Sequence, residues 1–249
     1  MYKKNVYTVL ENECIAESVY RMVLEGDTSY ITVPGQFINL KLEGRYLRRP
    51  ISVCDWDENT ITIIYKVVGD GTKDMSEAVR GDRFDILTGL GNGFSTGHMK
   101  KGQHAVVIGG GVGVPPLYAL VKKLIAEGVK VTAVLGFNEK AQIFYEEEFK
   151  KIGAEVFVTT VDGSYGTKGF VTDVLKDIDY DFYFTCGPEP MLRAVHKLGK
   201  EKNVCGLLSF EARMGCGFGA CMGCSCETIA GNKRICVEGP VMKSEEVML

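Results

Sequence analysis

Four cysteines in the last part of the chain have a spacing that suits metal chemistry. Within the stretch GCGFGACMGCSCET, residues 215–228, Cys216, Cys221 and Cys224 follow the pattern C-x4-C-x2-C, and Cys236 comes after eleven further residues. Thiolates are the usual ligands of iron–sulfur clusters, and this spacing is that of plant-type [2Fe–2S] proteins. The sequence therefore predicts a [2Fe–2S] cluster held by these four cysteines.

The residues between these cysteines are small, as a cluster loop requires. They leave room for backbone N–H groups to turn toward sulfur, and they are Gly217, Gly219, Ala220 and Gly223. A structural zinc site is the main alternative, although such sites more often contain two C-x2-C pairs and this stretch contains one. A set of unligated thiols is the other alternative. Cys226 is a spare thiol that a four-thiolate cluster does not need.

A run of glycines is the second chemical feature. In VVIGGGVGVPPL, residues 106–117, the glycines are Gly109, Gly110, Gly111 and Gly113, placed between a strand-like and a helix-like stretch. Such a loop lets a diphosphate approach the backbone at a helix N-terminus, where free N–H groups favour an anion. The spacing departs from G-x-G-x-x-G at Val114 and Pro116. A tight strand-to-helix turn without a ligand is the alternative.

Two further stretches are candidates for binding. CGPEPM, residues 186–191, also follows a strand, and ligands of open α/β sheets lie beyond the carboxyl ends of strands. We therefore expect CGPEPM and the glycine run to face one site. In the first part of the chain, YLRRPISV at 46–53 and VGDGTKDMSEAV at 68–79 place two arginines and Thr72 in polar surroundings. A charged strand end and a helix N-cap explain these two stretches equally well.

The spacing of apolar residues divides the chain into three regions, whose strands and helices must position the candidate binding residues. Residues 1–97 alternate in short runs, as at 38–42 and in ITIIYKVV at 61–68, which predicts an antiparallel sheet or small barrel. Residues 98–208 alternate between strands and helices, which predicts a parallel sheet. Residues 209–249 are rich in glycine and cysteine and have little periodicity, so we expect something other than a hydrophobic core to order them.

The helices of the middle region are predicted from apolar residues three and four positions apart. The first begins at Pro115 or Pro116, ends before Gly128, and has its apolar face at Leu117, Leu120, Val121, Leu124 and Ile125. The second follows CGPEPM and has its apolar face at Met191, Ala194, Val195 and Leu198.

Composition and charge exclude several classes of protein. The 249 residues are 45% hydrophobic and 24% charged, with a net charge of −3, so the chain is globular and nucleic acid is a poor candidate partner. No signal peptide or membrane span is recognisable. Nine cysteines without a signal indicate free thiols or metal ligands in the cytoplasm. The scattered Cys14, Cys54 and Cys205 are expected to be small buried apolar residues.

Taken in order, five stretches resemble the ferredoxin-reductase-like flavoproteins, in which a flavin-binding barrel precedes a nicotinamide-nucleotide domain. They are PGQFINL, RRPIS, GDGT, GGGVGVPP and CGPEPM, within residues 5–205. The resemblance implies that Arg49 holds the FAD diphosphate and that Ser52 places its hydroxyl near the flavin ring. Ile51 stands where many members have tyrosine. The other implied FAD contacts are Pro50, Ile51, Ile64, Tyr65, Lys66, Gly71 and Thr72, the last two at the diphosphate.

The same resemblance implies a nicotinamide site in the middle region. Gly109, Gly110, Gly111 and Gly113 bind the nucleotide, with Cys186 and Gly187 near its ring, and Ser52 and Cys186 are the residues nearest the chemistry. GFNEK, residues 136–140, lacks the arginine expected beside a 2′-phosphate, which favours NAD over NADP, although Lys140 is basic.

Over nearly its whole length the chain resembles the electron-transfer subunits of type B dihydroorotate dehydrogenases. FEARMGCGFGACMGC, residues 210–224, and RICVEGPV, residues 234–241, carry this resemblance. It implies that a separate FMN subunit oxidises dihydroorotate to orotate in pyrimidine synthesis, that electrons pass through the cluster and FAD to NAD+, and that two copies of each subunit assemble.

Two alternatives remain at the level of sequence. The chain could be a flavin and iron–sulfur reductase serving another donor or acceptor. It could also be a non-enzymatic redox sensor or zinc module, which would leave the flavin and nucleotide motifs unexplained. The three histidines are isolated and are predicted to lie at the surface or at strand ends: His98, His104 and His196.

Overall fold

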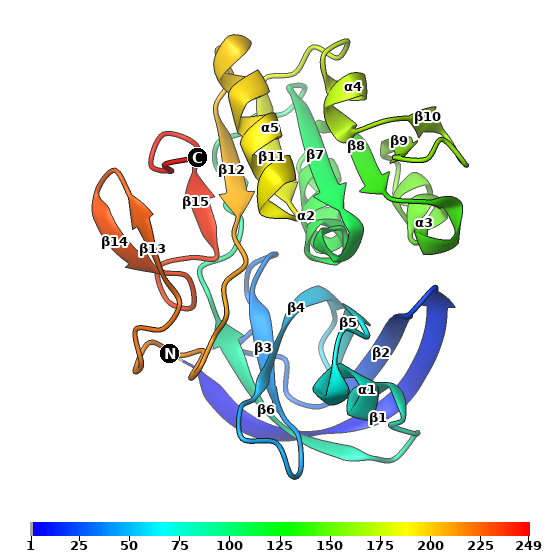
Figure 1. Ribbon diagram of the computed structural model, residues 1–249, viewed down its shortest axis with the longest axis vertical. Coiled ribbons are helices and arrows are strands. Elements are labelled where there is room, and N and C mark those ends of the chain that lie inside the picture. The colour runs from blue at the N-terminus through cyan, green and yellow to red at the C-terminus, as the bar shows by residue number, and fades with distance from the viewer. Residues whose placement is uncertain (1) are drawn as a thin grey trace.

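The computed structural model describes residues 2–249, which form a barrel, a sheet flanked by helices and a small C-terminal region (Figure 1). None of the helices in this part of the chain is long and apolar enough to cross a lipid bilayer.

The N-terminal region is a closed antiparallel barrel, as predicted. Its strand order is β1-β2-β5-β4-β3-β6, and the strands are β1 Lys3–Ala16, β2 Val19–Glu25, β3 Phe37–Lys41, β4 Arg49–Trp56, β5 Thr60–Lys66 and β6 Arg83–Leu90. Alternating apolar residues fill the interior, among them Met22, Leu24, Ile38 and Ile63, all fully buried. Helix α1, Asp70–Ser76, lies between β5 and β6 in the chain.

The middle region contains the predicted parallel sheet. Its order is β10-β9-β8-β7-β11-β12-β15, with β7 His104–Gly110, β8 Lys130–Phe137, β9 Glu155–Thr160, β10 Thr167–Lys168, β11 Phe182–Cys186, β12 Gly206–Ser209 and β15 Val241–Lys243. All of these strands are parallel except β15, which pairs antiparallel with β12. The helical elements are η1 Gly111–Gly113, α2 Pro115–Ala126, η2 Lys140–Gln142, α3 Glu146–Lys151, α4 Val171–Leu175 and α5 Glu189–Glu201.

Helix α5 packs three of its four predicted apolar residues against the core, because Val195 is buried and Met191 and Leu198 are half-buried, whereas Ala194 is exposed. The buried residues of the helix are Leu192, Val195, His196 and Gly199. His196 is only 3% exposed and its Nδ1 lies 3.3 Å from the Tyr183 hydroxyl, so the prediction of a surface histidine is wrong there. Gly199 allows this side of the helix to pack closely on β11, since a Cβ there would lie 2.6 Å from the Tyr183 ring.

The barrel and the sheet share one hydrophobic core. Cys54 and Ile64 of the barrel belong to the same buried cluster as Leu117 and Val121 of α2. Cys54 is thus a buried apolar residue, as predicted. The same prediction is wrong for Cys14 and Cys205, which are exposed.

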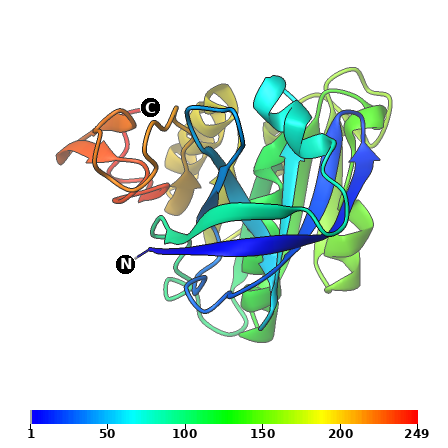
Figure 2. The same ribbon diagram turned by 90° about the horizontal axis from the view of Figure 1, so that it is seen from below.

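The C-terminal region is attached to the sheet rather than independent of it. It contains a hairpin, β13 Ser225–Thr228 and β14 Gly231–Arg234, and then β15, which is the edge strand of the seven-stranded sheet. The expected boundary near residue 208 therefore falls inside β12. Ile235, Cys236 and Val247 pack in one cluster with Leu208, so the region does have an apolar core. Figure 2 shows the hairpin at one side of the molecule, the side toward which the N-terminus also lies.

Candidate functional site

A cavity of about 550 Å³ opens at the carboxyl ends of the parallel strands. This size is within the usual range for a small-molecule site, and this edge of an α/β sheet is where nucleotides bind. Its walls include residues from β7, β8, β9 and α5, namely Gly110, Gly111, Gly136, Phe137, Asn138, Thr159, Pro188, Met191 and Ala194. Arginine is absent from the lining that the described residues form, and Lys66 is its basic residue, which fits NAD better than a 2′-phosphate.

The four glycines of the predicted nucleotide loop have two different roles. Gly110 and Gly111 line the cavity, and a Cβ on Gly111 would meet no atom within 4 Å, so its backbone is open to a ligand. Gly109 and Gly113 instead allow close packing. A Cβ on Gly113 would lie 2.3 Å from the Cys186 carbonyl oxygen, and one on Gly109 would lie 2.9 Å from the Val114 Cα.

Cys186 ends β11, Gly187 follows it, and both lie against this loop. A Cβ on Gly187 would approach the Gly110 backbone nitrogen to 3.1 Å, so the two predicted loops do meet. The Cys186 side chain is buried, and burial, followed by the charge of Glu211, raises its pKa to about 12. At neutral pH Cys186 is therefore a neutral thiol that packs, and it is unsuited to act as a nucleophile.

The cavity also receives one side chain from each of the other two regions. Lys66 comes from the barrel strand β5, and Glu211 comes from the segment that leads into the cysteines. The sequence interpretation missed Glu211 as a site residue. Its position in FEARMGC, five residues before Cys216, is the feature of the sequence that could have indicated a role in the site.

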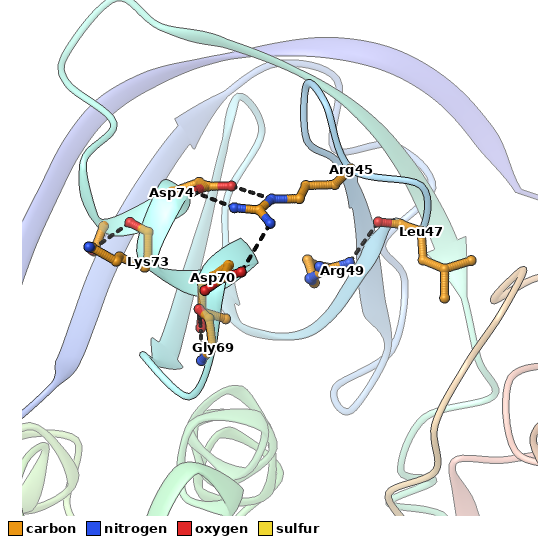
Figure 3. Close-up of polar contacts among 9 residues, drawn as sticks. Arg45, Leu47, Arg49, Gly69, Asp70, Lys73 and Asp74 are labelled. Carbon is orange, nitrogen blue, oxygen red and sulfur yellow. Dashed lines mark hydrogen bonds and ion pairs between the residues drawn. The ribbon is translucent and has the colours of Figure 1, made fainter.

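Three arginines near the predicted FAD diphosphate site differ in their partners, and two of them, Arg45 and Arg49, are shown in Figure 3. The Arg45 guanidinium pairs with Asp74 at 2.7 Å and Asp70 at 3.3 Å, and that of Arg48 pairs with Asp85 at 2.8 Å. Within residues 2–249, Arg49 has no carboxylate partner and donates to the Leu47 carbonyl at 2.7 Å.

The unpaired Arg49 lies over Gly71. A Cβ on Gly71 would be 2.3 Å from the Arg49 Nε, so glycine is required for the guanidinium to lie there. The structure thus brings together two predicted FAD contacts that are distant in sequence. An arginine without a carboxylate partner fits the phosphate groups of FAD.

Other predicted FAD contacts are engaged within the protein. The Thr72 hydroxyl donates to the Gly69 carbonyl at 2.9 Å and accepts from the Val68 and Gly69 N–H groups, so it caps α1. Tyr65 is buried in the barrel core with its hydroxyl 2.9 Å from Asn12 Oδ1. Burial raises the pKa of Tyr65. Pro50, Ile51 and Ser52 lie half-buried on β4, and Ile64 is buried.

The four predicted cluster cysteines occur as two pairs. The Cys216 N–H donates to Cys221 Sγ at 3.4 Å and the Cys221 N–H donates to Cys216 Sγ at 3.4 Å, while the Cys236 N–H donates to Cys224 Sγ at 3.4 Å. A [2Fe–2S] cluster has two irons that each take two thiolates, so two pairs suit it. In residues 2–249 no three Cys, His, Asp or Glu side chains converge as a site for one metal ion.

Backbone amides stabilise the thiolate at Cys216. Burial alone would raise the pKa of this thiol, but N–H groups of Phe218, Cys221 and Ala220 outweigh burial and lower the pKa to about 6. The glycines predicted in this loop are needed for the backbone conformation that turns these N–H groups toward sulfur. Gly217 and Gly219 have φ of +77° and +94°, and a Cβ on Gly219 would lie 2.6 Å from Val237 Cγ2.

Cys226 differs from the four paired cysteines. It lies in β13 opposite Lys233 of β14, and burial raises the pKa of its thiol. Its side chain packs against the apolar cluster around Ile235 and Leu208. This environment is that of a packed thiol rather than a metal ligand.

Family models match two parts of the chain. Residues 211–248 match the iron-sulfur cluster binding domain of dihydroorotate dehydrogenase B, and residues 107–197 match an oxidoreductase NAD-binding domain.

Solved structures support the fold. A structure described as an NADH-dependent reduced ferredoxin-NADP oxidoreductase is 30% identical, with a TM-score of 0.88 over 97% of this chain and 89% of that one. A ferredoxin reductase of carbazole 1,9a-dioxygenase is 22% identical, with a TM-score of 0.70 over 82% of this chain and 67% of that one, and shows the fold alone.

Full-length relatives have higher identity. The chain is 44% identical, over 100% of both chains, to the dihydroorotate dehydrogenase B (NAD(+)) electron transfer subunit of Geobacillus sp. (strain WCH70). It is 45% identical, over 96% of both chains, to the subunit of the same name from Fusobacterium nucleatum subsp. nucleatum. The chain therefore belongs to the family of electron transfer subunits of NAD(+)-linked dihydroorotate dehydrogenase B.

Proposed function

We propose that this chain carries electrons from dihydroorotate oxidation on a partner subunit to NAD+. One observation carries the proposal: a single cavity is lined by Gly110 and Gly111 of the nucleotide loop, by Lys66 of the flavin barrel and by Glu211 of the segment leading to the cysteines. The three regions that carry the redox motifs thus meet at one place, as electron transfer among them requires.

The chain's own residues hold and separate the redox groups. FAD exchanges two electrons with NAD and single electrons with a [2Fe–2S] cluster, which is the chemistry the groups supply when bound. Arg49 would bind the FAD phosphates, and the Ser52 hydroxyl would hydrogen-bond near the flavin ring. Gly110 and Gly111 would present their backbone to the nucleotide, and the neutral Cys186 thiol, buried at the end of β11, would lie near the nicotinamide. Cys216, Cys221, Cys224 and Cys236 hold the cluster.

The partner in this proposal is an FMN-containing catalytic subunit in an assembly of two copies of each chain. The name of the relatives as electron transfer subunits supports a catalytic partner. We also propose that the protein acts in pyrimidine synthesis in the cytoplasm, since all nine of its cysteines lie within the described residues and are free thiols, as expected in a reducing compartment.

A second candidate is a reductase that serves a different electron donor or acceptor. The similarity to the NADH-dependent reduced ferredoxin-NADP oxidoreductase structure favours it. The identity to that structure is 30%, however, against 44% to the Geobacillus dihydroorotate dehydrogenase subunit, which supports the first candidate.

The experiment that tests this function uses the purified full chain. FAD and iron are quantified, and anaerobic addition of NADH is followed by visible absorption and EPR. We expect one FAD and two irons per chain, with both flavin and cluster reduced by NADH. A colourless protein that contains zinc would contradict the proposal. Reduction by NADH without any effect of the dihydroorotate-oxidising partner would favour the second candidate.

A further inference from the structure

Asn39 is a polar residue of the barrel that the cluster loop covers. It alternates along β3 with Ile38 and Leu40 of the barrel core, so its side chain points away from that core. It is nevertheless only 1% exposed, because its Nδ2 donates to the carbonyl oxygen of Cys216 at 3.0 Å, across 177 residues of sequence. The contact extends to the next residue: a Cβ on Gly217 would lie 2.4 Å from Nδ2.

The backbone of Asn39 is itself fixed next to the flavin motif. Asn39 is opposite Pro50 in the pairing of β3 with β4, one residue from Arg49. The Arg48 Nη1 donates to the Asn39 carbonyl oxygen at 3.2 Å, and the Arg48 Nη2 bonds to Asp85 of β6 at 2.8 Å. Asn39 therefore joins the strand that carries the predicted FAD contacts to the loop of the first predicted cluster ligand.

Stability alone does not account for asparagine at this position. Its Oδ1 is buried and has no hydrogen-bond partner among the described residues. The cost of burying an unpaired carbonyl oxygen is as large as the gain from the one hydrogen bond that Nδ2 makes. An apolar side chain of similar size would avoid that cost. What the amide supplies, and an apolar side chain cannot, is a directional contact to the Cys216 carbonyl.

We propose that Asn39 is a positioning residue for electron transfer, which holds the Cys216 loop at a fixed place on the flavin barrel. This inference rests on the proposed function, because it concerns the step between flavin and cluster. Without the amide donor the Cys216 carbonyl loses its partner and the loop can move away from β3. The binding of FAD and the reaction of FAD with NADH do not involve Asn39.

The test compares Asn39→Leu with the wild-type full chain, both carrying FAD and iron. NADH delivers two electrons to the flavin as hydride and becomes NAD+, and the cluster then accepts one of them. Stopped-flow absorption follows the flavin, and freeze-quenched EPR follows the cluster. We expect flavin reduction at the wild-type rate and cluster reduction slowed about fivefold, the factor by which loss of one hydrogen bond shifts the equilibrium between the held and the displaced loop. We also expect a broader EPR line shape.

Matched variants separate positioning from a general loosening of the barrel. Thr88→Val removes a buried hydroxyl of the barrel that bonds to the Lys3 carbonyl at 3.5 Å and to the Tyr7 side chain, and it should leave cluster reduction unchanged. Asn39→His places an N–H at the same distance along the side chain and should restore the wild-type rate. If Asn39→Leu does not retain its cofactors, Asn39→Ala takes its place.

Three results bear on the inference in different ways. Wild-type cluster reduction in Asn39→Leu, or equal slowing in Thr88→Val, would overturn the role of Asn39. A wild-type cluster that NADH does not reduce would instead contradict the proposed function.

Discussion

At the scale of single residues, candidates for function differ from similar side chains nearby in the partners they have. Arg45 and Arg48 are neutralised by carboxylates, whereas Arg49 has none within residues 2–249. Cys224 accepts a backbone N–H at sulfur, whereas Cys226, two residues later, packs in a hairpin strand. Residue type alone does not separate these cases, because the difference lies in what surrounds each side chain.

The cysteine assignment predicts which substitutions remove iron. Replacing any of the four paired cysteines by serine should abolish or severely destabilise the cluster, since a hydroxyl is a poorer ligand for iron than a thiolate. Cys226→Ser should retain full iron content. Iron analysis and EPR of the dithionite-reduced proteins check this. Loss of iron in Cys226→Ser together with its retention in Cys236→Ser would show that the fourth ligand is misassigned.

The free guanidinium predicts a specific loss of FAD. Arg49→Ala should weaken FAD binding by about ten- to a hundredfold, the range for one charge-assisted hydrogen bond. Arg45→Ala is the control, because that arginine is already paired with Asp74 and Asp70. Ser52→Ala should keep FAD and slow its reduction by NADH. Fluorescence titration and stopped-flow absorption measure the two effects. Stoichiometric FAD in Arg49→Ala purified without added flavin would contradict the placement.

At the scale of elements, the turn from β7 through η1 into α2 sets the shape of the nucleotide site. Two of its glycines line the cavity, and the other two let the turn pack against α2 and the Cys186 carbonyl. Pro115 at the start of α2 needs no N–H partner and fixes φ for the first helical turn.

This packing predicts the effect of a single methyl group. Gly113→Ala places a Cβ 2.3 Å from the Cys186 carbonyl oxygen, so backbone must move, at a cost of about 1–3 kcal/mol. We expect the melting temperature to fall by several degrees and KM for NADH to rise. Gly97→Ala is the control, since its Cβ would meet only Ser95 Oγ at 3.5 Å. Unchanged stability and KM in Gly113→Ala would refute the close-packing role.

At the scale of the whole molecule, the C-terminal region is held at three places. β15 pairs with β12 of the sheet, Asn39 bonds to Cys216, and the Asn92 side chain bonds to both backbone groups of Val241, at 2.7 and 3.1 Å. The cluster region is thus fixed to both other regions.

The division of labour between subunits gives a prediction for the isolated chain. It should pass electrons from NADH to artificial acceptors but should not oxidise dihydroorotate, because the described residues offer one barrel for a flavin, whereas dihydroorotate oxidation in this proposal needs the FMN of the partner. Adding the FMN subunit should restore NAD+-linked orotate formation. A steady-state assay of each subunit alone and of both together measures this. Orotate production by this chain alone would refute the proposal.

The sequence by itself determined the features that depend on local spacing. The cysteine pattern within residues 216–236, the alternation of the barrel strands and the strand–helix order of the sheet are all properties of neighbouring residues, and they suffice for the fold class and for the cluster hypothesis. The tertiary structure alone decided the features made by distant residues. Which arginine stays unpaired, which glycines face the cavity, the burial of His196 and the contact of Asn39 with Cys216 depend on segments up to 177 residues apart. The pattern of residues along one segment does not show which distant segment will pack against it. Packing and charge pairing depend on the residues that are neighbours in space.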